Sequence, residues 1–398
     1  MYGWCGEMKK IYVGMVLFCL LFGAAGLSAQ TARALVAQAR KESDPAARIR
    51  LLTRAVQKAP KLATAWHYRG DTYRLTGDYK RALADYTRAL RLTPDDPFRY
   101  YARALAYMDA RQYAQAEADL TKAISLKKNY PDFYLSRAKA NMFLKKYNAS
   151  VADYKRYLER APKTPPVALG LAEAYFEAYQ YPEAEAELTE LLAQNPDEAE
   201  AYFWMGRIYQ NTNRPDEAVS FFSKAVNRDS DYASAYRYRA SVFKDMGELE
   251  ASAEDYGRLL ALDPQDIFYN RRGLVYEEMG DLEKALADYN KTIELSPKWP
   301  IGYTNRGYIY LKQKKYTSAR KDFETAIKLD DSLPTPYINL AGVYWLQKKD
   351  KRNVYRNLEK ALKRGFRDFD ALYDEDRKGW MFRGINKTSE FRAVMYQD

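Results

Sequence analysis

The sequence predicts an all-α fold, a right-handed superhelical solenoid of about ten helix-turn-helix repeats with a C-terminal capping helix. Three observations predict this class: a pattern that recurs every 34 residues, apolar stripes at helical spacing, and prolines that follow the second stripe of a repeat. A fixed period of 20 to 50 residues is typical of solenoids. The 398-residue chain also has 36 tyrosines but only 19 glycines, a composition unlike that of an ordinary α/β enzyme.

The period appears when distant segments are aligned. Residues 63–73 and 300–310 both carry an aromatic residue at the fourth place, Arg at the seventh, Gly at the eighth and Tyr at the eleventh. The spacing between repeats is 34 residues, broken once by 33. The repeats begin near residues 29, 63, 97, 131, 165, 199, 233, 266, 300 and 334.

Each repeat contains two helical stripes. The fourth, eighth and eleventh residues lie on one face of a first helix, and the eighth residue is small in nine of ten repeats. The 20th, 24th and 27th residues form a second stripe, as in Ala82, Tyr86 and Ala89. A turn such as Thr76-Gly77-Asp78 separates the stripes, and a proline such as Pro94 ends the second helix because proline cannot continue it.

This pattern resembles the tetratricopeptide repeat family, in its exported bacterial form, over residues 29 to about 367. The resemblance implies a stack of helix pairs that binds protein or peptide partners and has no catalytic role. We therefore expect ten repeats over residues 30–367 and a capping segment over 368–398. In that last segment the period is lost, but apolar residues such as Trp380 and Phe391 remain to cover the final hydrophobic face.

Residues 1–29 have the pattern of a bacterial secretory signal peptide. Lys9 and Lys10 precede an apolar run over residues 11–27, which ends in small residues before Gln30. We expect cleavage, and hence a periplasmic, envelope-associated or secreted protein. The alternative is an uncleaved anchor, which would be the chain's one link to a membrane. Cys5 and Cys19 both lie in this segment, so the mature chain would have no cysteine for a disulfide or a thiolate metal site.

Most tyrosines and six arginines are expected to serve packing. Of the 36 tyrosines, 23 fall in four places of the repeat. The seventh residue is Arg in six repeats, and those same six repeats carry Asp at the 23rd residue. This joint variation predicts a bidentate bridge between the two helices of a repeat. The predicted pairs are Arg69–Asp85, Arg103–Asp119, Arg137–Asp153, Arg239–Asp255, Arg272–Asp288 and Arg306–Asp322.

In such a solenoid the first helices line the concave face, and the candidate partner-binding residues come from this face. The fifth, ninth and twelfth residues should face this groove, and they are mostly apolar in repeats three to six. Repeats seven and eight instead offer polar residues such as Arg237, Ser241 and Lys244. The alternative is that coiling buries several apolar positions between repeats. The candidate contact residues are Tyr101, Met108, Met142, Glu173, Phe176, Phe203, Trp204 and Arg207.

Charge is distributed unevenly along a chain whose net charge is +11. Residues 164–206 contain nine acids and no Lys or Arg, whereas residues 348–367 contain nine bases and two acids. Solvated outer faces would explain both stretches. Alternatively, the acidic repeat binds a basic segment, and the basic end contacts an anionic surface. The candidate residues for that surface are Lys348, Lys349, Lys351 and Arg352.

No motif for catalysis, a cofactor or a metal is found. His67 is the chain's one histidine, so a metal site is not expected, and no phosphate-binding loop or nucleophile elbow appears. Repeat proteins that bind extended peptide backbones carry a ladder of Asn at the sixth residue of successive repeats, and here only Asn305 and Asn339 match it. Some proteins of this family bind a chaperone tail with a set of Lys, Asn and Arg residues on successive first helices. That set is not present here, because Arg237, Ser241 and Arg271 stand among its positions.

We expect a non-catalytic periplasmic or cell-envelope scaffold or adaptor that binds protein partners through its concave surface. The alternative function is an accessory factor of an envelope enzyme or assembly, which binds anionic glycan or glycolipid through the basic C-terminal end. Nucleic acid is not an expected partner, because an exported protein rarely meets it.

Overall fold

The computed structural model describes residues 28–374 and 377–395. Within these ranges the regular elements are all helices, so the predicted all-α repeat fold is confirmed. None of the helices in the described ranges has both the length and the apolar character that spanning a bilayer requires. Nearly all of the predicted signal segment, with Cys5 and Cys19, lies outside the described residues.

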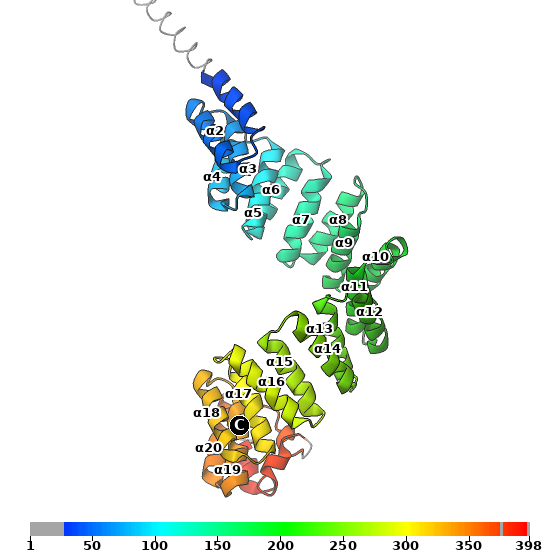
Figure 1. The fold of residues 1–398 in the computed structure, drawn as a ribbon, viewed down its shortest axis with the longest axis vertical. Coiled ribbons are helices and arrows are strands. Elements are labelled where there is room, and N and C mark those ends of the chain that lie inside the picture. The colour runs from blue at the N-terminus through cyan, green and yellow to red at the C-terminus, as the bar shows by residue number, and fades with distance from the viewer. Residues whose placement is uncertain (1–27, 375–376, 396–398) are drawn as a thin grey trace, which may run out of the picture. The chain divides into compact units, whose positions relative to one another are not determined.

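The chain forms two compact halves, the first ending at Pro196 and the second beginning at Asp197. The N-terminal half starts with a helical stretch over residues 28–39, and helix pairs follow one another along the chain (Figure 1). Its helices are α2 (Pro45–Lys58), α3 (Ala63–Leu75), α4 (Tyr79–Leu92), α5 (Pro97–Asp109), α6 (Tyr113–Leu126), α7 (Pro131–Phe143), α8 (Tyr147–Leu158), α9 (Pro165–Glu177) and α10 (Tyr181–Gln194).

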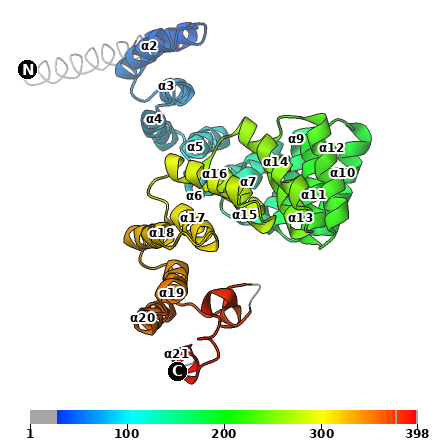
Figure 2. The same ribbon diagram turned by 60° about the horizontal axis from the view of Figure 1, so that its bottom comes forward.

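The C-terminal half continues the pairing and adds a short tail of helical turns (Figure 2). From α3 onward, every first helix in either half begins at one of the repeat starts read from the sequence. The helices of this half are α11 (Ala199–Asn211), α12 (Pro215–Arg228), α13 (Ala233–Asp245), α14 (Leu249–Leu262), α15 (Asp266–Glu278), α16 (Leu282–Leu295), α17 (Pro300–Lys312), α18 (Tyr316–Leu329), α19 (Pro334–Lys348), α20 (Lys351–Lys363), η1 (Asp370–Leu372), η2 (Gly379–Phe382) and α21 (Ser389–Met395).

A left-handed residue closes the turn between the two helices of a repeat. Glycine takes this place at Gly77, Gly247 and Gly280, where φ is 79 to 83°. Six other repeats place a non-glycine residue there, including Lys145 at φ 57° and Lys314 at φ 61°. A left-handed conformation costs a non-glycine residue about 1 kcal/mol. The packing of the helices on both sides of the turn therefore imposes the conformation, and glycine is not essential for it.

The small eighth residue of a repeat makes room for an aromatic ring from the second helix. A Cβ on Gly206 would lie 2.6 Å from the ring of Phe222, and a Cβ on Gly273 would lie 2.7 Å from the ring of Tyr289. Both rings are fully buried. The pairing of a small residue with a large ring thus sets how closely the two helices of a repeat approach.

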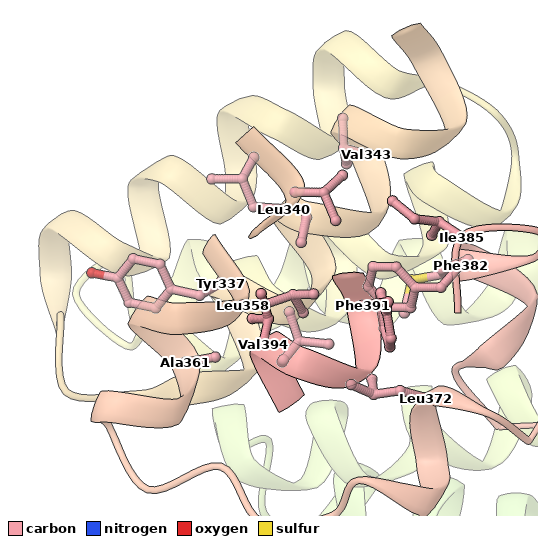
Figure 3. Close-up of a cluster of buried hydrophobic side chains, with 14 of the residues drawn as sticks. Tyr337, Leu340, Val343, Leu358, Ala361, Leu372, Phe382, Ile385, Phe391 and Val394 are labelled. Atoms are coloured by element: carbon pink, nitrogen blue, oxygen red, sulfur yellow. The ribbon is translucent and has the colours of Figure 1, made fainter. Parts of the chain in front are cut away.

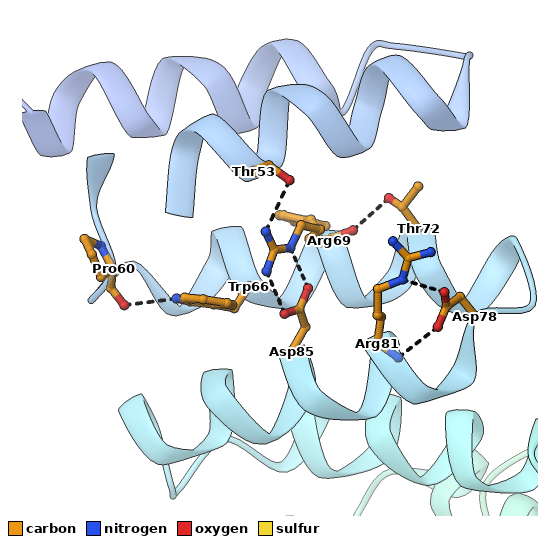
Figure 4. Close-up of polar contacts among 9 residues, drawn as sticks. Thr53, Pro60, Trp66, Arg69, Thr72, Asp78, Arg81 and Asp85 are labelled. Atoms are coloured by element: carbon orange, nitrogen blue, oxygen red, sulfur yellow. Dashed lines mark hydrogen bonds and ion pairs between the residues drawn. The ribbon is translucent and has the colours of Figure 1, made fainter. Parts of the chain in front are cut away.

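Arg69 illustrates how arginine joins the helices (Figure 4). Its Nε and Nη2 donate to the two carboxylate oxygens of Asp85 at 2.6 and 2.8 Å. Hydrogen bonding to Asp85, whose residue surface is only 5% exposed, raises the pKa of Arg69. The guanidinium carbon lies 4.9 Å from the ring centre of Trp66 and 5.8 Å from that of Tyr73, within cation–π range.

The other five predicted pairs have the same bidentate geometry, with nitrogen–oxygen distances of 2.7 to 2.9 Å. In each pair the aspartate is buried and the arginine lies partly exposed at the edge of the repeat. These pairs are Arg103–Asp119, Arg137–Asp153, Arg239–Asp255, Arg272–Asp288 and Arg306–Asp322.

Arginine also reaches the preceding repeat, which the sequence analysis did not foresee. Nη1 of Arg69 donates to Thr53 Oγ1 at 3.2 Å, and Thr53 belongs to α2 of the repeat before (Figure 4). Four more bridging arginines make the equivalent bond, at 2.8 to 3.1 Å. Their acceptors are Thr87, Thr121, Ser223 and Asn290. One arginine therefore connects three helices from two repeats.

The tail forms the last part of the core, as Figure 3 shows. Residues of α19 and α20, such as Leu340 and Leu358, pack with Leu372, Phe382 and Phe391 of the tail. Within this cluster, η2 packs against α19 and α21 packs against α20. The tail thus covers the hydrophobic face that the tenth repeat would otherwise expose.

Gly257 provides a test of the contact between repeats. It takes the place in α14 that Ser223 takes in α12, and a Cβ there would lie 3.6 Å from Nη1 of Arg272. We expect Gly257→Ala to stabilise the protein by about 1 kcal/mol through helix propensity. Gly257→Ser should be at least as stable as Gly257→Ala, because its hydroxyl can accept the missing hydrogen bond from Arg272.

Urea unfolding of the wild type and both variants measures this. Propensity alone would make the serine variant less stable than the alanine variant by about 0.5 kcal/mol. A serine variant that is less stable by that amount would show that no bond to Arg272 forms.

Candidate functional site

The first helices of neighbouring repeats contact one another within each half. In the N-terminal half α5 touches both α3 and α7, and in the C-terminal half α11 touches α13 and α17 touches α19. We call the surface formed by the successive first helices of a half its first-helix face. Because it spans several repeats, this face can present side chains from different repeats to one partner.

The N-terminal half carries five of the candidate contact residues. Three lie half-buried on α5 and α7: Tyr101, Met108 and Met142. Glu173 on α9 is also half-buried, whereas Phe176 on the same helix is only 6% exposed. These residues contribute to the first-helix face to different degrees, and Phe176 contributes least.

Tyr101 takes part in packing between repeats. Its ring centre lies 5.1 Å from that of Phe133 and 6.3 Å from that of Tyr130. The Ser136 hydroxyl on α7 also donates to the Tyr101 hydroxyl at 3.4 Å. Tyr101 is therefore one of the residues that join α5 to the following repeat.

The C-terminal half carries the other three candidates, Phe203, Trp204 and Arg207, all on α11. Trp204 and Arg207 are half-buried, and Arg207 lies with its guanidinium carbon 5.9 Å from the Trp204 ring centre. Arg207 also stacks on Tyr238 of α13, at 4.1 Å from the ring centre. Arg207 thus reaches across to the next first helix.

Two candidates differ from the expectation of an open apolar groove. Phe203 is 6% exposed, because its ring centre lies 5.3 to 5.9 Å from those of Phe222, Tyr232 and Tyr238. Phe176 packs beside Tyr181, with 5.4 Å between the ring centres. Aromatic packing takes up both side chains, and so the apolar groove predicted at these two positions is not present.

A cavity of about 380 Å³ lies on the first-helix face of the C-terminal half, and we call it the arginine cavity. It is formed by α11, α13, α14 and the start of α15. Its wall combines two arginines, three aromatic rings, an isoleucine, and the polar side chains of two glutamines and a serine. The lining residues are Gln210, Arg237, Tyr238, Ser241, Tyr256, Gln265, Ile267, Phe268 and Arg271.

The arginine cavity carries positive charge and no carboxylate in its lining. Arg237 and Arg271 are both exposed, and neither forms an ion pair with any residue that the structure describes. The guanidinium carbon of Arg237 lies 4.6 Å from the ring centre of Tyr238, on which Arg207 also stacks. The cavity therefore presents two exposed arginines, of which Arg237 is stacked on Tyr238.

A second cavity of about 280 Å³ lies between α15, α17, α19 and the tail, and we call it the tail cavity. Its lining includes Glu277, Tyr308, Asn339 and Lys378. The Lys378 ammonium donates to Asn339 Oδ1 at 3.1 Å and lies 5.0 Å from the Tyr308 ring centre. Burial lowers the pKa of Lys378, although the charge of Glu277 acts in the opposite direction.

The tail crosses the first-helix face at this cavity. The Trp345 indole donates to the Arg383 carbonyl at 3.0 Å, and the Trp380 indole donates to the Tyr308 hydroxyl at 3.4 Å. The two ladder asparagines are also engaged: Asn339 accepts from Lys378, and Asn305 donates to Asn270 at 2.8 Å. Both asparagines therefore bond to other residues of this chain, Asn339 to Lys378 of the tail and Asn305 to Asn270 of α15.

A third cavity, of about 260 Å³, lies in the N-terminal half and is lined in part by Arg40, Tyr68 and Asp71. Asp71 accepts a hydrogen bond from the Tyr86 hydroxyl at 2.6 Å and lies 3.5 Å from Nε2 of His67. In the described ranges there is no group of three or more His, Cys, Asp or Glu residues that could hold a metal ion.

The basic stretch is exposed at the turn between α19 and α20, whereas the acidic stretch includes the half-buried Glu173 of α9. Lys348 ends α19, Lys349 adopts a left-handed turn, and Lys351 and Arg352 begin α20; all four are exposed. The acidic stretch is partly neutralised by Lys163, whose ammonium lies 2.9 Å from Glu187 and 2.8 Å from Glu190. The basic turn therefore keeps more of its charge open to solvent.

Sequence reasoning missed Tyr238, Arg271 and Lys378 as functional candidates. The count of apolar groove positions favoured repeats three to six, although arginines on α11, α13 and α15 were visible as a run of cations on successive first helices. Lys378 lies outside the repeat period, so no repeat position pointed to it.

Family models for the tetratricopeptide repeat match most of the repeat region. The matched segments are residues 70–110, 101–165, 144–200, 175–241, 267–298 and 300–333. No curated protein matches this sequence.

The chain is similar to several solved structures. A tetratricopeptide repeat protein from Parabacteroides merdae is 19% identical, with 62% of this chain and 99% of that one covered and a TM-score of 0.49. YrrB, a TPR protein with an unusual peptide-binding site, is 19% identical, with 47% and 97% covered and a TM-score of 0.44. Yeast Tom70 is 16% identical, with 84% and 85% covered and a TM-score of 0.40.

The single histidine allows a test of the network around Asp71. Burial lowers the pKa of His67 below its ordinary value of 6.5; Asp71 opposes this shift, and the charge of Arg99 adds to it. The folded chain then binds this proton less readily than the unfolded chain. The free energy of unfolding should therefore fall as the pH drops below 6.5, and His67→Gln should remove this part of the fall.

Urea unfolding at several pH values compares the two proteins, and the single imidazole resonance in an NMR titration reports the pKa directly. An imidazole that titrates above 6.5 in the folded protein would contradict the dominance of burial.

Proposed function

Because this chain belongs to the tetratricopeptide repeat family, we propose that it is a non-catalytic scaffold or adaptor that binds protein partners on its first-helix face. The family's fold is a platform for protein–protein interaction, and its members bind protein or peptide partners. The observation that carries the proposal is the arginine cavity, where three successive first helices contribute side chains to one concave site.

The first-helix face suits an extended or helical segment of a partner. The arginine cavity offers an apolar wall at Ile267 and Phe268, beside hydrogen-bonding groups of Gln210 and Ser241. Peptide-binding grooves commonly combine side-chain pockets with polar groups that hold the backbone. The half-buried residues Trp204 and Arg207 lie on α11, which also lines the cavity, and would extend the contact.

The proposed place of action is the periplasm or cell envelope, or outside the cell. The support is the order of charged, apolar and small residues within residues 1–29, which is the order of a secretory signal. The proposal of a non-catalytic role has a separate support. The repeats account for residues 29 to about 367, and the tail from 368 packs on their last two helices.

Site-specific cross-linking tests the scaffold function. A photoreactive amino acid at Ser241, inside the arginine cavity, should capture a defined protein partner in cells that express the chain. The same amino acid at Arg258, an exposed position on the second helix α14, is the control and should capture far less. Equal capture at both positions, or no protein captured at Ser241, would contradict binding on the first-helix face.

The basic end supports a second function, in which the chain assists an envelope enzyme or assembly by contacting anionic glycan or glycolipid. Its support is the exposed turn between α19 and α20, with Lys348, Lys349, Lys351 and Arg352 close together. None of the four forms an ion pair with a residue in the described part of the chain. Such a cluster attracts an anionic surface most strongly at low salt.

Charge reversal tests this second function. Changing the four residues of the basic turn to Glu should abolish co-sedimentation with phosphatidylglycerol vesicles at low salt. The control reverses four exposed lysines elsewhere, Lys58, Lys61, Lys80 and Lys122, and should sediment like the wild type. If both variants lose binding equally, net charge explains the effect and the basic turn is not a specific site.

A further inference from the structure

We propose that the tail cavity binds a small zwitterion, a free α-amino acid, with Lys378 holding its carboxylate and Glu277 holding its ammonium group. The cavity is formed where the tail returns onto α15, α17 and α19, so it does not follow from the repeat. It shares no lining residue with the arginine cavity. The proposal therefore stands apart from the scaffold function.

Lys378 brings a positive charge into the tail cavity without a negative partner. Its ammonium has three N–H groups, but the structure gives it one acceptor, Oδ1 of Asn339 at 3.1 Å. No carboxylate of the described residues forms an ion pair with it. Burial lowers the pKa of Lys378, because contact with water is lost and not replaced. An anion that enters the cavity would restore this lost stabilisation.

Burial distinguishes Lys378 from the unpaired cations on the surface. Arg237, for example, is exposed, so water completes its hydrogen bonds. Lys378 is half-buried, with its ammonium 5.0 Å from the Tyr308 ring centre. The ammonium of Lys312 lies at the same distance from that ring, but it has a partner, because Glu277 is 3.3 Å away. Of the two lysines beside Tyr308, only Lys312 therefore has its charge compensated within the described ranges.

Glu277 supplies the opposite charge to the same cavity. Its Oε2 accepts from the Tyr289 hydroxyl at 3.1 Å, and its Oε1 lies 3.3 Å from the ammonium of Lys312. Each carboxylate oxygen can accept two hydrogen bonds, so both keep room for a further donor. The charge of Glu277 opposes the effect of burial on the pKa of Lys378, although these two described side chains form no ion pair with each other. A ligand that carries both charges on neighbouring groups fits between them.

The other two charged residues of the lining pair with each other. Arg377 and Asp368 form an ion pair within the tail. A ligand would therefore meet one available cation, Lys378, and one available anion, Glu277. Water molecules can complete the hydrogen bonds of Lys378, but they bring no negative charge, and buried charges in proteins are normally paired.

The size of the cavity favours a molecule as small as an amino acid. Its volume of about 280 Å³ is near the lower end of small-molecule pockets, which is about 300 Å³. Asn305 and Thr335 offer polar groups to a short side chain, beside the apolar Leu274. The ligand that fits is thus an amino acid with a small polar side chain.

Isothermal titration calorimetry of the full chain tests this with two probes, L-serine and L-asparagine. At least one of them should bind saturably. Its α-amide, which lacks the carboxylate, and its N-acetyl form, which lacks the ammonium group, should each bind at least about tenfold more weakly, because each loses one charged contact.

Variants locate the site. Lys378→Met and Glu277→Gln should each weaken binding by about tenfold or more, because each removes one charge and keeps the approximate size of the side chain. The matched controls Lys363→Met and Glu278→Gln remove the same charges from exposed positions on α20 and α15 and should bind like the wild type. Circular dichroism checks that all variants remain helical. If a site variant does not, the amide and N-acetyl probes on the wild type still decide the question.

Four results would overturn the proposal. The first is that neither amino acid binds the wild type saturably, and the second is that the amide binds as tightly as its parent. Equal binding of the N-acetyl form would show that the cavity takes a simple carboxylate and that Glu277 has no role. Unchanged binding in both site variants would place the ligand elsewhere. None of these results bears on capture at Ser241, so the scaffold function is decided separately.

Discussion

The structure depends on the bidentate contact between an arginine on the first helix of a repeat and a buried aspartate on the second. The same guanidinium also binds a hydroxyl or amide oxygen on the preceding second helix in five of six cases. In a solenoid each repeat touches only its neighbours, so stability is a sum of repeat and interface terms. A residue that contributes to both terms couples folding within a repeat to stacking between repeats. The N-terminal half contains three such arginines, Arg69, Arg103 and Arg137, and the C-terminal half contains two, Arg239 and Arg306.

Where the arginine is absent, the repeat relies on apolar contacts. Leu171, Met205 and Leu340 take its place in repeats five, six and ten, and all three are at most 5% exposed. Repeats five and six are also the two that adjoin the boundary at Pro196. In repeat ten, the tail supplies additional hydrophobic contacts. The bridge is therefore one of two solutions that this chain uses to join its helices.

Much of the fold could be predicted from the sequence because the same residue pattern recurs in successive repeats, and each recurrence supports the same assignment. One Arg and one Asp at matching places would mean little, but six matched pairs in the sequence indicate a contact. The third partner was missed, although Thr53, Thr87 and Ser223 each precede their arginine by 16 residues, as many as separate it from its aspartate. That symmetry is visible in the sequence once both sides of the arginine are compared.

The candidate site was harder to predict, because a cavity depends on how three helices meet and not on the character of single positions. Counting apolar residues pointed to Phe176 and Phe203, whose rings the structure buries. The tail was harder still: Lys378 binds Asn339, 39 residues away, through contacts that follow no repeat. This contact also gives a repetitive surface a fixed terminus. A ligand chain lying along the first helices of the C-terminal half would meet the tail at Asn339, so the surface has a defined end from which the register of a bound chain can be set.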